Sequence, residues 1–190
     1  MGMSNWVTAT RVAPAAGSSF GTFTTAKTVI PASALETIRA GSLFVGAATQ
    51  IIVCGGIGTL VTTPGTITFQ SMIGSVIAFT TGALQLNATA HTDLPFWLDI
   101  LLTCRSIGDG TNATMIGQAK AHGVMFTETA LQVDGVNTHS YLMAPDTTPT
   151  VGTGFDSTTD KILDFFAGFS ISDAANTITV DQYVVKRLNW

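Results

Sequence analysis

His91 and Asp93 form the pair in this sequence whose spacing most suggests metal binding. Residues two positions apart on a β-strand project from the same face, so an imidazole nitrogen and a carboxylate oxygen would lie side by side there. A zinc site takes three or four protein ligands, and no third one lies close by in the sequence. We therefore predict no metal ligands and no cofactor. For His91, His122 and His139 we expect hydrogen-bonded or solvent-facing positions.

No other group of residues indicates catalysis. The run Gly55-Gly56-Ile57-Gly58-Thr59 resembles a phosphate-binding loop only superficially, since it lacks the lysine and the following helix. The acidic residues between Asp156 and Asp164 have the pattern of a solvated loop. Asp99 and Arg105 share a strand face, where we expect them to pair with neighbours. A Ser-His-Asp or Cys-His set assembles from distant parts of a chain, and nothing here points to one. We predict a non-enzymatic protein without catalytic residues.

Cys54 and Cys104 both lie in apolar, strand-like runs. Two cysteines do not make the disulfide framework of a small secreted domain. A buried free thiol behaves as a small apolar group. We expect both cysteines to be reduced, as in a protein made in a cytoplasm, with a single bridge between them as the alternative.

The chain has few charges for its length. Its 190 residues include 12 acidic and 8 basic side chains, and only 11% are charged, against about 25% in an ordinary globular domain. The mean hydropathy of +0.41 excludes overall disorder, which requires low hydrophobicity. Proteins that coat nucleic acids need clustered cations, which a net charge of −4 does not supply. We therefore expect no nucleic-acid partner.

The low charge could indicate a membrane protein, because no Asp, Glu, Lys or Arg lies between Arg39 and Asp93. Residues 43–61 and 67–86 are apolar over the length of a membrane helix. Both windows contain several glycines together with recurring Thr, Ser and Gln, however, and no basic flank sets an orientation. The first six residues also lack the basic start and apolar run of a secretory signal. We expect β-strands here and no membrane partner.

Strand formers punctuated by glycine dominate the rest of the chain. The only candidate helix is a brief one within 32–39, and 144–161 is predicted to be a polar, exposed loop after a weaker strand or loop at 131–142. Gly55-Gly56 is expected to turn the chain. We predict strands at 28–30, 42–54, 58–62, 66–73, 76–80 or on to 86, 96–106, 114–126, 163–172 and 177–188, with turns at Pro64-Gly65 and Thr81-Gly82.

Alternation along these strands predicts which face is buried. Within 96–106, the even-numbered residues from Phe96 to Cys104 are apolar and face the core, whereas Trp97 and Leu101 lie on a mixed face. The inward face of 114–126 carries small residues, which indicates close approach by a facing sheet or another subunit. The last strand is expected to direct Ile178, Val180 and Val184 inward and Asp181, Tyr183 and Arg187 outward.

These elements predict an all-β fold, a jelly-roll-like β-sandwich of roughly eight to ten strands. Residues 1–26 contain the flexible run Ala15–Ser19 and isolated apolar anchors, so we expect an extended N-terminal arm there. Residues 27–190 form the predicted sandwich domain.

Several segments resemble small all-β structural proteins of tailed bacteriophages, from about residue 28 onward. The longest is LPFWLDILLTCRSIG at 94–108, an aromatic strand that ends in a TxRxIG-like turn and leads to the Gly-x-Ala pattern at 117–119. Similar elements are Ile30-Pro31 to Leu35, Ala40-Gly41-Ser42 and the segment 174–185. The motifs indicate a fold and a bacteriophage origin, and they contain no catalytic residues.

The resemblance implies a virion component made in a bacterial host cytoplasm. Its first implication is a capsid decoration, or cement, protein that binds the major capsid protein and stabilises capsomer contacts. Such modules often form trimers, and apolar surface outside the core normally marks subunit interfaces, so a homotrimer is predicted. The candidate assembly contacts are Trp6, Phe20, Phe23, Trp97, Leu101 and Phe166.

The alternative is a head- or tail-fibre module that binds a host receptor or glycan. That function calls for exposed aromatic side chains with polar partners. We expect them on loops, with Tyr141 and the 144–160 segment as candidates.

Overall fold

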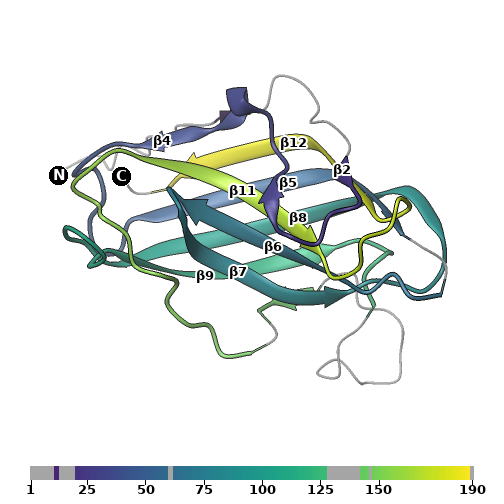
Figure 1. The fold of residues 1–190 in the computed structure, drawn as a ribbon. Helices are drawn as coiled ribbons and strands as arrows, with labels where there is room; N and C mark the ends of the chain where they lie inside the picture. The colour runs from purple at the N-terminus through teal and green to yellow at the C-terminus, as the bar shows by residue number, and fades with distance from the viewer. Residues whose placement is uncertain (1–10, 13–19, 60–61, 128–141, 146, 189–190) are drawn as a thin grey trace.

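The computed structural model is a β-sandwich of two antiparallel sheets packed face to face, as Figure 1 shows. It describes residues 11–12, 20–59, 62–127, 142–145 and 147–188. The seven-stranded sheet has the order β1-β12-β5-β8-β9-β10, with β2 also on β12. The five-stranded sheet has the order β3-β11-β6-β7, with β4 also on β11. The predicted all-β sandwich is therefore confirmed.

Seven long strands build the two sheets, and their positions follow the sequence pattern closely. Short strands of two or three residues at the sheet margins bring the number in the described residues above the expected eight to ten. Of these, the pattern indicated only the one at Lys27–Thr28, which overlaps the predicted strand 28–30. A 3-10 helix forms at Ala32–Ala34, inside the segment where a brief helix was expected. The strands are β1 (Arg11–Val12), β2 (Phe20–Gly21), β3 (Lys27–Thr28), β4 (Glu36–Ile38), β5 (Ala48–Thr59), β6 (Thr66–Ile73), β7 (Val76–Gln85), β8 (His91–Ser106), β9 (Thr114–His122), β10 (Leu142–Ala144), β11 (Lys161–Phe169) and β12 (Thr177–Arg187).

The core lies between the inner faces of the sheets and is held by a row of aromatic rings. Phe69 of β6 stacks on Phe96 of β8 at 5.6 Å and on Phe165 of β11 at 5.7 Å between ring centroids. Phe165 in turn lies 6.2 Å from the ring of Tyr183 on β12. Rings from both sheets thus interdigitate, and the predicted inward face of β8 is confirmed, with every member from Phe96 to Cys104 buried.

The prediction that Gly55-Gly56 turns the chain is wrong. β5 continues through both glycines to Thr59 and pairs along its length with β8 and β12. A Cβ atom on Gly55 would collide with the carbonyl oxygen of Thr179 on β12. The glycines therefore serve close approach of the neighbouring backbone, which is the other use of glycine within a strand.

The predicted facing of β12 is correct as far as Asp181, which is exposed as expected. A β-bulge interrupts the pairing with β5 between Val180 and Gln182, so the alternation changes phase there. Tyr183 is fully buried, contrary to prediction, and Val184 is directed away from the core. Arg187, also predicted to face outward, is partly buried and donates to Glu36 Oε1 and to the Thr37 carbonyl oxygen, both at 2.7 Å.

The small residues of β9 do allow close approach by the facing sheet. A Cβ atom on Gly117 would collide with the ring of Phe79 on β7 and lie 2.8 Å from Leu102 Cδ2. The predicted exposed loop after β10 packs closely as well. Gly152 N–H donates to the Met115 carbonyl oxygen at 2.8 Å, and Phe155 is buried. This segment therefore helps to close the side of the sandwich beside β9.

The N-terminal segment is described only in part. Arg11–Val12 and Phe20–Gly21 both pair with β12, while 1–10 and 13–19 lie outside the described residues. The division into an arm at 1–26 and a domain at 27–190 remains a prediction. Within the described part of the chain, no helix has the length and apolar character that crossing a membrane requires.

Truncation of neighbouring phenylalanines on β11 tests this packing. We expect Phe165→Ala to lower the free energy of unfolding by about 3–5 kcal/mol, because it leaves a cavity in a closed aromatic row. Phe166→Ala should cost less than about 2 kcal/mol, since that side chain is only partly buried on the opposite face. Urea denaturation of both variants measures the difference. Equal losses would contradict the assigned facing of β11.

Candidate functional site

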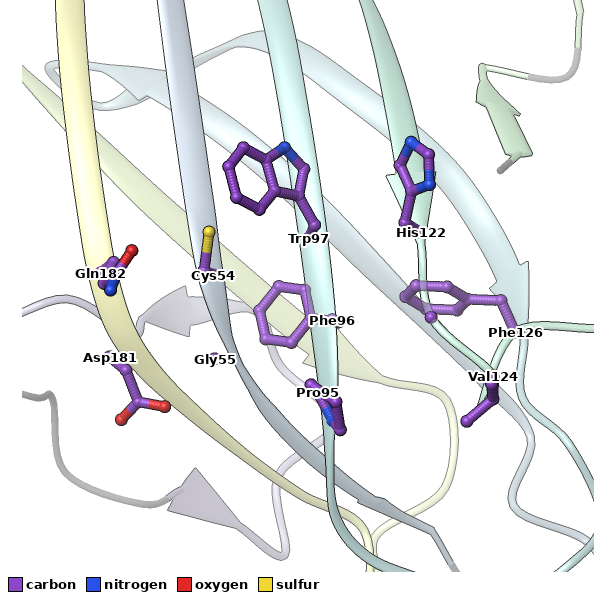
Figure 2. A pocket seen from close by; sticks show the side chains of 11 residues that line it. Cys54, Gly55, Pro95, Phe96, Trp97, His122, Val124, Phe126, Asp181 and Gln182 are labelled. Atoms are coloured by element: carbon purple, nitrogen blue, oxygen red, sulfur yellow. The ribbon is translucent and has the colours of Figure 1, made fainter. Parts of the chain in front are cut away.

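The outer face of the seven-stranded sheet contains a hollow of about 630 Å³. Figure 2 shows it from close by, with β12, β5, β8 and β9 side by side and the Trp97 indole between Cys54 and His122. Ligand pockets in proteins commonly span about 300–1,000 Å³. The size of the hollow is therefore suitable for a small molecule or for one end of a longer chain.

A single cross-strand row sets the centre of the site. The pairing register joins Gln182 of β12 to Cys54 of β5, Cys54 to Trp97 of β8, and Trp97 to His122 of β9. Side chains directly opposite on neighbouring strands have Cβ atoms about 4.5–5.5 Å apart. The Trp97 side chain is 47% exposed. It forms an accessible aromatic surface flanked by side chains that can form hydrogen bonds.

The β-bulge supplies the polar margin of the hollow. Because β12 carries one extra residue there, Asp181 and Gln182 are both exposed in succession. In Figure 2 both side chains lie on the β12 side of the hollow, next to Cys54 and Gly55. A carboxylate accepts hydrogen bonds, and a carboxamide both donates and accepts them. The bulge therefore presents two adjacent groups that can bind hydroxyls.

The opposite margin is mostly apolar, apart from His122. Val124, which is 68% exposed, and Phe126 follow β9, and Pro95 lies two residues before Trp97 on β8. Together with the indole, these side chains offer carbon surface to a ligand while the other margin offers polar groups. Such a division orients a ligand that has both an apolar and a polar side.

The Cys54 thiol is not an activated nucleophile. Burial raises its pKa first, and the negative charge of Asp181 raises it further. The thiol therefore remains protonated at neutral pH, where a reactive cysteine needs a lowered pKa. The pKa of the Cys104 thiol is also raised by burial. Both cysteines are free, so the alternative of a bridge is wrong: Cys54 lines the outer hollow and Cys104 lies in the core.

The candidate assembly contacts fall in different places. Trp97 and Leu101 share the outer face of β8 at nearly equal exposure, 47% and 46%. Phe166 is partly buried in the other sheet, at a position of β11 that alternates with the core residues. Phe20 and Phe23 pack edge to face at 6.5 Å, with Lys27 Nζ 4.8 Å and 4.4 Å from their ring centroids. Trp6 lies outside the described residues.

The remaining chemical candidates do not form a centre. Among the described residues, no three His, Cys, Asp or Glu side chains gather to hold a metal ion. His139 and Tyr141 lie outside them. Asp99 accepts a hydrogen bond from Gln50 Nε2 at 2.9 Å. Of the histidines and carboxylates singled out in the sequence, His122 lines the hollow, where it stands opposite Trp97.

The sequence pattern missed the site as a whole. It identified Trp97 but assigned it to subunit contacts, and it placed ligand-binding aromatics on loops. The signal that was present is the Gly-Gly pair in β5, which allows Thr179 and Asp93 to approach the strand closely. The bulge in β12 left no signal, because sequence alternation does not reveal it.

No family model matches the chain, and no curated protein matches it. A solved structure, described as the CBM2 module of the Lactobacillus casei BL23 phage J-1 evolved Dit, is similar at 14% identity. The match covers 82% of this chain and 69% of that one, with a TM-score of 0.34. A similarity this low does not establish a common function.

Alkylation of the two cysteines tests the electrostatics of the hollow. We expect iodoacetamide to label Cys54 in the folded protein and to leave the buried Cys104 unlabelled. Asp181→Asn should shift the pH midpoint of Cys54 labelling downward, because it removes a negative charge that disfavours the thiolate. Intact mass measured against time at several pH values gives the rates.

Asp173→Asn, on the hairpin before β12, is the matched control and should leave the midpoint unchanged. An unchanged midpoint in Asp181→Asn would show that the carboxylate does not act on Cys54.

Proposed function

We propose that this chain is a non-enzymatic, glycan-binding β-sandwich module of a bacteriophage particle. The observation that carries the proposal is the exposed Trp97 indole in a hollow that Asp181, Gln182 and His122 also line. The bacteriophage part rests on the resemblance of the sequence segments from about residue 28 onward.

The composition of the hollow suits a sugar ring. A pyranose has a face of C–H groups and an edge of hydroxyls. The indole is a large, flat apolar surface that can cover the C–H face. Asp181 and Gln182 can then bind hydroxyls at the edge. All of these groups stand on paired strands, which hold a binding geometry more firmly than loops do.

Of the two functions predicted from the sequence, these features favour the receptor- or glycan-binding alternative. It was expected to show exposed aromatics with polar partners, although on loops. Capsid decoration predicts broad apolar contact with the major capsid protein, and the Trp97 hollow offers polar groups that such a contact would leave without partners.

Subunit assembly is a second candidate for the same face, because Leu101 is also exposed there. Leu101, Thr103, Ile116, Gln118 and Pro149 line a smaller hollow of about 250 Å³ farther along β8 and β9. A homotrimer that uses this surface would bury Leu101 and Trp97 together. Their nearly equal exposure makes them a matched pair for separating the two functions.

Alanine substitution of this pair is the decisive test. We expect Trp97→Ala to weaken glycan binding at least tenfold, about 1.4 kcal/mol, and Leu101→Ala to leave it within about twofold. Trp97→Phe should retain part of the binding, since a smaller ring still covers the sugar. Calorimetry with ligands identified on a glycan array measures the affinities, and light scattering reports the oligomer.

Assembly through this face predicts a different result. Both alanine variants would then weaken the oligomer, and no glycan would bind the wild-type protein. That outcome contradicts the glycan-binding proposal. Thermal unfolding of each variant shows that the fold is retained.

The copy number on virions tests the phage assignment. A receptor-binding module of a fibre should be present in about a few dozen copies or fewer, because fibres occupy a small number of symmetric sites. Quantitative mass spectrometry of purified virions gives the number. Hundreds of copies would support decoration of the capsid, and absence from virions would contradict both functions.

A further inference from the structure

We infer that the Trp97 hollow takes an uncharged sugar and excludes anionic glycans, with Asp181 as the residue that determines this specificity and Asp93 as a second carboxylate nearby. The inference rests on the proposed function and names the class of ligand for the same site. It follows from the charges in and beside the hollow and from the donors that a sugar carries.

Negative charge is not balanced inside the hollow. Asp181 is among the described residues that line it, and no Lys or Arg is. The field of Asp181 reaches the centre of the site, since it acts on the Cys54 thiol next to Trp97. Lys120 stands opposite Asp99 in the next cross-strand row, where the two opposite charges face each other. An anionic ligand in the hollow would therefore meet a carboxylate without meeting a cation.

Asp93 adds a second carboxylate beyond the end of the hollow. A Cβ atom on Gly56 would collide with the carboxylate of Asp93, so that carboxylate lies directly over the glycine. The Asp93 backbone has φ of 51°, a left-handed conformation that is uncommon for a residue other than glycine. Asp93 thus lies against Gly56 of β5, while Asp181 follows Val180, which pairs with Gly55. Two carboxylates flank consecutive residues of one strand.

Carboxylates in this position suit neutral sugars for a chemical reason. An ionised carboxylate only accepts hydrogen bonds, and its two oxygens can bind two adjacent hydroxyls, which are donors. A sialic acid, sulfate or phosphate presents acceptors and a negative charge to the same oxygens. Two like charges in a partly desolvated hollow repel each other more strongly than they would in water.

The apolar half of the site supports the same class. Trp97, Val124 and Phe126 together offer carbon surface on the side opposite Asp181. A pyranose that lays its C–H face on the indole directs its ring-edge hydroxyls sideways, toward the polar margin. Figure 2 shows Asp181 and Val124 on opposite sides of β8, the strand that carries Pro95 and Trp97.

The test compares each neutral glycan with its own anionic derivative. The probe is an array that prints every neutral chain beside its sialylated and sulfated forms, followed by calorimetry on the best matched pair. We expect the wild-type protein to bind the neutral form at least tenfold more tightly than the anionic one. Asp181→Asn should reduce that ratio by at least threefold, and Asp173→Asn should leave it unchanged. High salt should also reduce the ratio, because it screens the repulsion.

The outcomes separate this inference from the proposed function. Binding of neutral and anionic forms with equal affinity, preference for the anionic form, or an unchanged ratio in Asp181→Asn would overturn the inference while leaving glycan binding in place. Absence of binding to every glycan would overturn the proposed function and the inference with it. The Cys54 labelling rate gives a second readout, since a bound neutral sugar should protect that thiol and its anionic derivative should not.

Discussion

The pairing of β5 with both β12 and β8 is the constraint on which the rest of the structure depends. β5 carries inward Ile51 and Val53 into the core, and it continues through Gly55-Gly56 because neither residue has a side chain to push the neighbouring strand away. Thr179 and Asp93 come close to the strand at these two positions. A turn at the glycines would separate β12 from β8 and would remove both the closed core and the outer hollow.

The bulge in β12 lies in the pairing of β12 with β5. It brings Tyr183 into the aromatic row of the core and leaves Asp181 and Gln182 exposed on the outer face. One extra residue therefore serves the packing of the sandwich on one side and the chemistry of the hollow on the other. A substitution that removed the bulge would change both.

The low charge of the chain leaves uncharged surface for contacts with a ligand and with other subunits. Only 11% of residues are charged, and much of the outer face of the seven-stranded sheet is uncharged or apolar. In the proposed function, the surface around Trp97 covers a sugar ring, while the patch around Leu101 is available for contact with other subunits. A few carboxylates then have a large influence on which ligand can bind, because no Lys or Arg is among the described residues that line the hollow.

The sequence by itself determined the all-β class, the buried face of β8 and the positions of the long strands, since strict alternation over eight or more residues leaves one face for the core. It also singled out Trp97. Only the tertiary structure decided the course of β5 through Gly55-Gly56, the facing of β12 beyond Asp181 and the grouping of Trp97 with Asp181. These depend on which strands become neighbours, and pairing partners far apart in the chain leave no periodic signal in either strand. The sequence alone does not distinguish a glycine that permits close approach from a glycine that turns the chain, because the difference depends on the position of the neighbouring backbone.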